Sequence, residues 1–138
     1  MRGCIVAFAA YRIPKLIQAI NSCATSGVDV MCVFESQDAS SGKVAVPSPK
    51  QLGLVPKVRV FVWPLARRQK NSRGLYGCLH AKCAAVDGEL LFVSSANLTE
   101  SAFNLNMELG VLIRGGSLPC AIESHFRALI SAGYLVRA

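Results

Sequence analysis

Three short apolar runs dominate the first half of the chain and constrain its fold more than any other feature. Residues 4–11, 28–34 and 58–63 are rich in β-branched and aromatic residues, and polar, Gly or Pro residues bound each run. Runs of this length and composition predict buried β-strands. Because a segment with helical spacing separates the first two runs, the order strand–helix–strand predicts an α/β fold, with a mixed β-sheet sandwiched by helices.

Two segments have the spacing of amphipathic helices. Pro14 suits the first turn of the first helix, where a missing N–H costs nothing, and Gly27 suits the position just past its end. Ser117 can cap a second helix near the end of the chain. The apolar residues expected on the buried faces are Leu16, Ile17 and Ile20 in the first helix and Ile122, Phe126, Leu129 and Ile130 in the second.

The second half of the chain contributes three more expected strands. Residues 79–86 and 89–93 flank Asp87-Gly88, a dipeptide that is typical of a two-residue hairpin turn. Residues 107–113 form the next run, after a polar segment with room for one helical turn. Residues 37–56, between the second and third strands, are rich in Ser, Gly and Pro and predict a long loop or a short irregular helix.

Composition excludes several classes of protein. With 138 residues, 52% of them hydrophobic and 17% charged, the chain can bury a core, and a mainly disordered chain is excluded. We expect residues 1–138 to be one domain, either complete or the C-terminal part of a longer parent chain. No apolar run approaches the ~20 residues of a spanning helix, so we expect no stable membrane insertion. The six cysteines form no CxxC pair, which predicts free thiols in a reducing, cytoplasmic compartment.

Two residues of the expected strand 79–86 carry a chemical pattern. His80 and Lys82 are two positions apart, so in a strand they project to the same side. An imidazole can attack phosphorus, and an ammonium can neutralise the non-bridging oxygens of a phosphate. Cys78 and Cys83 bracket His80, but two thiols and one imidazole are a weak zinc site, so we expect no metal and no cofactor.

Three further polar residues follow the expected hairpin. Strand pairing would bring Ser95 and Asn97 back beside His80, where the Asn97 amide can donate to a phosphate oxygen without adding charge. Glu108 lies near the start of the next strand, and a carboxylate there can fix the tautomer of an imidazole. Taken singly, each residue has an ordinary interpretation as a turn, cap or surface residue. Their joint spacing indicates a site for a phosphate group.

This joint spacing resembles the sequence motif of the phospholipase D superfamily: HxK, four residues, D, six residues, GSxN. The matching residues are His80, Lys82, Asp87, Ser95 and Asn97. Ser94 stands where the family usually has Gly. The resemblance implies a phospholipase D-like half domain that carries a single motif, in which Asp87 has a structural role.

The same resemblance implies a role for each of the other residues. His80 would be the nucleophile that forms a phosphohistidine. Lys82 and Asn97 would hold the phosphate oxygens, with Ser95 in support. Glu108 would orient a catalytic imidazole of its own or a partner subunit, and no metal would take part.

The two-step chemistry needs two imidazoles, whereas the chain has one motif. One imidazole attacks phosphorus; the other protonates the leaving oxygen and later activates water. His125 is the only other histidine, and it has no lysine partner on the expected last helix. We therefore expect a homodimer with one composite active site, to which each chain contributes its His80. A second half-site in a longer parent chain is the alternative.

A basic interval precedes the motif. The chain has a formal net charge of +7, and no acidic residue lies between Asp38 and Asp87. Four basic residues of this interval fall in the expected loop 66–77, namely Arg67, Arg68, Lys70 and Arg73. Such a loop can follow a phosphate backbone, while Trp63 and Tyr76 beside it can stack on bases. A solvated loop that serves only solubility is the alternative.

These observations together predict a metal-independent phosphodiesterase, most simply a nuclease, with DNA favoured over RNA. A phospholipid headgroup hydrolase or transferase with the same site is one alternative, and a non-catalytic nucleic-acid-binding subunit is another. Residues 94–100 and 106–110 also resemble the phospholipase D-like protein of the DISARM anti-phage defence system. That resemblance implies a role in antiviral defence, with other subunits of a defence complex as partners.

Overall fold

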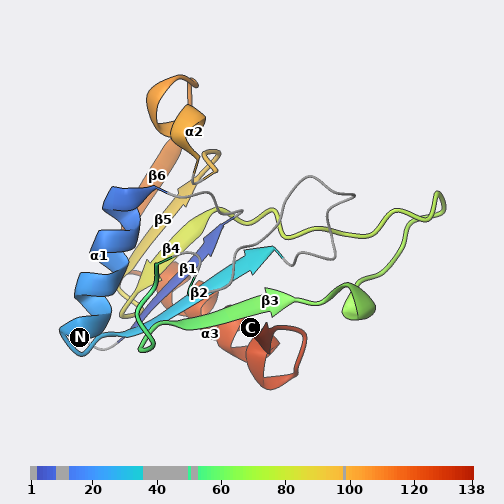
Figure 1. Cartoon of the computed structure of the whole chain (residues 1–138), viewed down its shortest axis with the longest axis horizontal. Helices are drawn as coiled ribbons and strands as arrows, with labels where there is room; N and C mark the ends of the chain where they lie inside the picture. Colours follow the sequence, from blue (N-terminus) through green and yellow to red (C-terminus); the bar gives the residue numbers. More distant parts are fainter. Residues whose placement is uncertain (1–2, 9–12, 36–49, 51–52, 98) are drawn as a thin grey trace.

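A mixed β-sheet with one long helix on each face forms the body of the molecule (Figure 1). The computed structural model describes residues 3–8, 13–35, 50, 53–97 and 99–138. Within these ranges the sheet has seven strands in the order β6-β5-β4-β1-β2-β3-β7. The expected α/β fold with a mixed sheet between helices is confirmed. Most of the expected loop before the third strand lies outside the described residues, as do the last residues of the expected strand 4–11.

The elements follow the expected order with shifted ends. The strands are β1 (Gly3–Phe8), β2 (Asp29–Glu35), β3 (Arg59–Trp63), β4 (Cys83–Val86), β5 (Leu90–Ser94), β6 (Gly110–Arg114) and β7 (Val136–Arg137). The helices are α1 (Pro14–Thr25), the short α2 (Glu100–Asn104) and α3 (Leu118–Ser131). Two expected strands begin later than predicted: residues 79–82 precede β4, and residues 107–109 precede β6. The two-residue strand β7 is too short to leave a pattern in the sequence.

The core has two layers because the central strands bury both of their faces. Along β1, Val6 faces the layer that contains Ile20 of α1, and Ile5 faces the layer that contains Phe126 of α3. Burial of each such apolar side chain stabilises the fold by about 1.5–3 kcal/mol. This alternation explains why the first strands are apolar at nearly every position.

The strand register brings the ends of several strands together at one end of the sheet. β1 pairs in parallel with β2 and antiparallel with β4, and Ala7 near the end of β1 lies opposite Cys83 at the start of β4. Ser94 at the end of β5 lies opposite Gly110 at the start of β6. The carboxyl ends of β1, β2 and β3 therefore share one end of the sheet with the start of β4, the end of β5 and the start of β6. We call this the site end.

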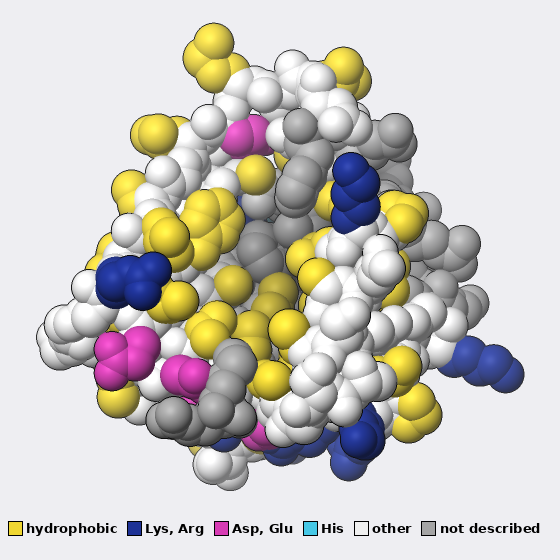
Figure 2. Space-filling view, turned by 90° about the vertical axis from the view of Figure 1, so that its left-hand side faces the viewer, with side chains coloured by type: hydrophobic (Ala, Val, Ile, Leu, Met, Phe, Trp, Pro, Cys, Tyr) yellow, Lys and Arg dark blue, Asp and Glu magenta, His cyan; other side chains and the backbone are white. Residues whose placement is uncertain are grey.

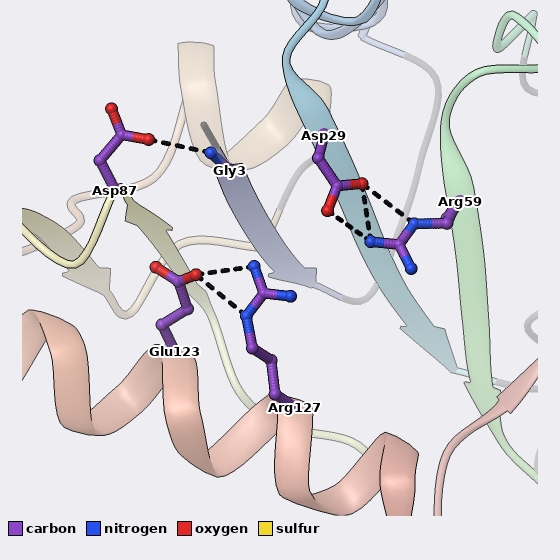
Figure 3. A network of polar contacts seen from close by, with 6 residues as sticks. All are labelled: Gly3, Asp29, Arg59, Asp87, Glu123 and Arg127. Carbon is purple, nitrogen blue, oxygen red and sulfur yellow. Dashed lines mark hydrogen bonds and ion pairs between the residues drawn. The ribbon is translucent and has the colours of Figure 1, made fainter. Parts of the chain in front are cut away.

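The opposite end of the sheet is held by the hairpin turn. Asp87 and Gly88 have φ angles of 56° and 68°, as a type I′ turn requires, and Glu89 N–H donates to the Val86 carbonyl at 3.0 Å. The Asp87 carboxylate also accepts the Gly3 N–H at 2.9 Å (Figure 3). The expected two-residue turn is thus confirmed, and it fastens the hairpin to the first residue of β1.

Two ion pairs appear in the same view as this turn (Figure 3). Arg59 of β3 donates three hydrogen bonds to Asp29 at the start of β2: Nε donates to Oδ1 at 3.0 Å, and Nη2 donates to Oδ1 at 2.6 Å and to Oδ2 at 2.5 Å. On α3, Arg127 donates to Glu123 at 2.8 Å. Because both pairs are partly exposed, each contributes at most about 1 kcal/mol.

All six cysteines are unpaired, as expected. Cys32 and Cys83 are buried, whereas Cys23, Cys78 and Cys120 are exposed. Burial raises the pKa of the Cys32 thiol to about 12 and that of Cys4 to about 11. The thiols within the sheet are therefore protonated at neutral pH and pack as small apolar groups.

At the β6 edge, an aromatic ring lies across a glycine. A Cβ atom built on Gly110 would come within 2.9 Å of Cε2 of Phe92, a residue of the neighbouring strand β5. Real Cβ atoms essentially never come that close to another heavy atom, so a side chain at position 110 would require the Phe92 ring to shift.

Candidate active site

His80 and Lys82 lie side by side in the segment that leads into β4. The His80 ring is exposed, whereas Lys82 is only 7% exposed. Lys82 Nζ lies 3.2 Å from His80 Nδ1 and 3.3 Å from Nε2, and it donates to the His80 carbonyl oxygen at 3.0 Å. Lysine is almost never buried without a compensating partner. Here the buried ammonium places positive charge beside an accessible imidazole, where an anion can be bound and attacked.

Glu108 is held by two donors of its own chain. Ser95 Oγ donates to Oε2 at 2.5 Å, and Asn106 Nδ2 donates to Oε1 at 3.0 Å. These hydrogen bonds, first from Ser95 and then from Asn106, lower the pKa of Glu108, and the charge of Lys82 acts in the same direction. Ser95 and Glu108 are therefore brought together, within electrostatic reach of Lys82.

The predicted role of Glu108, to orient an imidazole of its own or a partner subunit, stays a prediction. Within the described part of this single chain, its two carboxylate oxygens accept from a hydroxyl and an amide rather than from a ring nitrogen. Sequence reasoning missed Asn106. The available signal was its position two residues before Glu108, close enough in the chain for its amide to reach the carboxylate.

Ser94 closes the turn at the end of β5. Its N–H donates to the Lys82 carbonyl at 3.0 Å, which ties β5 to the segment carrying the lysine. Its hydroxyl donates to the Leu109 carbonyl at 3.3 Å and accepts the Ala96 N–H at 3.0 Å. The serine that replaces the usual glycine of the motif thus orders the backbone on both sides of Ser95.

Asn97 lies two residues beyond Ser95, just past the site end of the sheet. Its carbonyl oxygen accepts the Thr99 N–H at 2.8 Å. Its side-chain Oδ1 is buried and has no hydrogen-bond partner among the described residues. The amide is therefore not held by a structural hydrogen bond through its oxygen. Asp87, by contrast, lies at the opposite end of β4, and its contact with Gly3 is structural.

The basic loop is an ordered projection, seen in Figure 1 as the long extension beyond β3. We call residues 67–77 the basic arm. Lys70 and Tyr76 form a bridge between its two sides, and Lys70 Nζ lies 4.6 Å from the centre of the Tyr76 ring. At the tip, the Asn71 side chain accepts the N–H groups of Arg73 and Leu75 at 2.9 and 3.0 Å. Lys70 and Arg73 are exposed, as is Arg67 at the base.

Arg68 differs from the expectation of a solvated, nucleic-acid-binding loop residue. It is 6% exposed and forms a buried ion pair with Glu35, the last residue of β2. Its guanidinium also lies 5.0 Å from the centre of the Trp63 ring, so Arg68 occupies one face of this partly buried indole and leaves that face unavailable for stacking on a base. Tyr76 alone of the two expected aromatic residues is exposed on the arm.

Among the residues described, no group of three or more His, Cys, Asp or Glu side chains is placed to hold a metal ion. None of the helices within those residues is long and apolar enough to cross a bilayer.

Comparisons with known proteins agree on one family. The sequence model described as "Cardiolipin synthase, PLD-like domain" matches residues 2–130. The chain is 42% identical over 65 residues to the DISARM protein DrmC of Bacillus paralicheniformis. That match takes in 47% of this chain and 26% of the relative, so it spans about a quarter of the relative's length.

Two solved structures share the fold. NucT from Helicobacter pylori superposes with a TM-score of 0.81 at 20% identity, covering 100% of this chain and 83% of that one. Nuc from Salmonella typhimurium, a phospholipase D family member, superposes with a TM-score of 0.69 at 17% identity, covering 99% and 82%. At these identities the likeness establishes the architecture.

We predict that Ser95→Ala raises the pKa of Glu108, because the Ser95 hydroxyl is the main cause of its lowering. Asn106→Ala should raise it less. Carboxyl carbon NMR titration measures both changes, with Ser101→Ala on α2 as a control. Because the folded pKa lies below the unfolded one, the stability that Glu108 contributes is present above pH ~4.3 and is lost as the pH falls through the folded pKa. An unchanged titration in Ser95→Ala would contradict the assignment.

Proposed function

This chain belongs to the family of phospholipase D-like domains, and we propose that it is a metal-independent phosphodiesterase that cleaves nucleic acid. One observation carries the proposal: the buried Lys82 ammonium lies 3.2 Å from the ring of the exposed His80. A nucleophile and a desolvated cation at this distance can engage the same phosphate group. The electrostatic gain is larger here than in water because Lys82 is shielded from solvent.

The proposed reaction has two steps. A ring nitrogen of His80 attacks phosphorus, and the bond from phosphorus to the leaving oxygen breaks while a second imidazole donates a proton to that oxygen. That second imidazole then takes a proton from water, whose oxygen attacks phosphorus and displaces His80. Lys82 and the Asn97 amide would hold the non-bridging oxygens, with Ser95 in support. Glu108, ionised and held by Ser95 and Asn106, would orient an imidazole.

The second imidazole would come from a second copy of the chain. His125 lies exposed on α3 in edge-to-face contact with Phe126, and the motif histidine occurs once.

Beside Glu108 lies an exposed row of apolar residues that we call the apolar strip. Its residues are Leu105, Met107, Leu109 and Val111, which are 54–102% exposed.

The position of the apolar strip supports a composite site. Met107 and Leu109 flank Glu108 in the chain and are both exposed, so the apolar strip adjoins the carboxylate. Figure 2, which shows the side of the molecule that carries α1 and the β6 edge, displays hydrophobic side chains over much of this surface. Exposed apolar surface of this kind is typical of protein interfaces. Pairing through the strip would bury it and bring two sites together.

The basic arm supports nucleic acid as the substrate. It projects from the site end of the sheet, and its exposed cations Arg67, Lys70 and Arg73 can follow a phosphate backbone. Tyr76, exposed on the same arm, offers a ring for stacking. We propose DNA before RNA. The 42% identity over 65 residues with the DISARM protein DrmC supports a role in defence. We further propose that the protein acts in the cytoplasm, beside other subunits of a defence complex.

We predict that wild-type protein cleaves nucleic acid in EDTA and that His80→Ala reduces cleavage to the level of a no-enzyme reaction, since the nucleophile is gone. Labelled single- and double-stranded DNA and RNA serve as substrates. His125→Ala, the matched control, should keep full activity. Cleavage that survives in His80→Ala would dismiss the site. Release of headgroups from phospholipid vesicles without cleavage of nucleic acid would identify the protein as a phospholipid hydrolase or transferase. Binding of nucleic acid without cleavage would identify it as a non-catalytic binding subunit.

We predict that Lys70→Ala/Arg73→Ala weakens DNA binding and makes it less sensitive to salt. The slope of the logarithm of the binding constant against the logarithm of the salt concentration should become shallower by about two, because each lost phosphate contact removes about one unit of slope. Fluorescence anisotropy across a salt series measures the slope. Lys57→Ala, which removes an exposed cation just before β3, should leave it unchanged. An unaltered slope in the arm variant would mean that the arm serves only solubility.

We predict that Leu109→Glu converts a dimer to a monomer at micromolar concentration and lowers cleavage by ~100-fold or more, because general acid catalysis contributes about 10²–10⁴. Sedimentation velocity measures the assembly. Leu118→Glu is the control, because it places the same charge at an exposed residue outside the apolar strip. Leu118 begins α3 near the hairpin end of the sheet, where Cys120 lies against Gly88. A wild-type monomer that cleaves at these concentrations would remove the composite site.

A further inference from the structure

A buried ion pair at the site end has no role in the steps above. Glu35 ends β2 and is 7% exposed, and Arg68 at the base of the basic arm is 6% exposed. Burying two charges is expensive, and such a pair is often no more stabilising than apolar residues of the same volume. Its contacts therefore suggest a purpose other than stability.

Arg68 closes the base of the basic arm. Its Nε donates to the Trp63 carbonyl at 3.0 Å, at the end of β3, and its Nη1 donates to the Gly77 carbonyl at 3.0 Å. Trp63 precedes the arm and Gly77 is its last residue. One planar guanidinium thus holds the two ends of the arm together, which the point charge of a lysine would do less well.

Glu35 holds the backbone immediately before the nucleophile. Its carboxylate accepts the N–H of Leu79, the residue next to His80. Residues 79–82 precede β4, so this segment is not held by the regular ladder of the sheet. It is anchored at one end by Glu35 and at the other by the bond from Ser94 N–H to the Lys82 carbonyl. His80 lies between these two anchors.

We propose that Glu35 and Arg68 are positioning residues that fix His80 for attack and couple it to the basic arm. The inference rests on the proposed function for its catalytic part. A displacement of about 1 Å at a reacting group can cost about 100-fold in rate. Loss of the pair should therefore lower kcat by about that factor and leave KM for a small substrate nearly unchanged.

The test compares three changes at the pair. Glu35→Gln keeps an oxygen for the Leu79 N–H but loses the charge. Arg68→Lys keeps the ion pair but cannot reach both carbonyls as a fork, so it should retain an intermediate kcat. Glu35→Met/Arg68→Met replaces the pair by apolar side chains, which separates folding from positioning because apolar replacements of buried pairs commonly stay folded.

Two substrates separate positioning from binding. Bis(4-nitrophenyl) phosphate is too small to span the arm, whereas a labelled oligonucleotide can contact it. Glu35→Met/Arg68→Met, with a melting temperature near that of wild type, should lose about 100-fold in kcat on both. Asp29→Asn, which breaks the ion pair at the other end of β2, should stay within twofold of wild type. A folded double variant with wild-type kcat on both substrates would overturn the proposal that the pair positions His80. A loss of kcat on the oligonucleotide alone would overturn it as well.

NMR distinguishes failure of this inference from failure of the proposed function. In wild type the Leu79 amide should exchange slowly with solvent. Glu35→Met/Arg68→Met, which removes the acceptor of this N–H, should speed the exchange and shift the His80 ring signals. Glu35→Gln, which keeps an acceptor, should change the exchange less, and Asp29→Asn should change neither signal. The NMR signals do not require turnover, so a wild type that cleaves nothing would refute the proposed function and leave this measurement valid. Unchanged Leu79 and His80 signals in the double variant would refute the positioning role.

Discussion

The pairing of β4 with β1 is the constraint on which the rest of the molecule depends. β1 joins a parallel half, with β2 and β3, to an antiparallel half, with β4, β5 and β6. With Ala7 opposite Cys83, the segment that carries His80 and Lys82 enters the sheet beside the carboxyl end of β1. A slip by one residue would turn every side chain of β4 to the other face and carry the lysine with it.

Much of the fold follows from local patterns, because those patterns have local causes. The Asp87-Gly88 turn is predictable since few residue pairs tolerate positive φ angles at both positions, and the hairpin then brings Ser95 back toward Lys82. The ends of β4 and β6 are less predictable. In both strands the apolar residues extend beyond the positions that pair. Whether a residue pairs depends on how far the neighbouring strand reaches, and the local sequence pattern does not contain this information.

The contacts that escape prediction join residues far apart in the chain. Arg68 lies in a run of cations and Glu35 ends an apolar strand, so each looks like a solvated charge; only the folded sheet shows that they meet. The same holds for Asn106, whose role becomes visible once Glu108 is placed beside Ser95. At this site, residue types and spacing indicate the chemistry, whereas tertiary contacts determine what holds the reacting groups in place.

The ring of Phe92 over Gly110 has a consequence for how this sheet edge can vary over evolution. A Cβ atom at position 110 would meet both this ring and, at 3.1 Å, the Val93 carbonyl oxygen, so a larger residue in β6 requires the aromatic ring and the backbone of β5 to shift. Since Gly110 follows Glu108 by two residues, drift at this edge would also disturb the carboxylate. Under the proposed function, selection on activity would thus act on Gly110 as well as on Glu108.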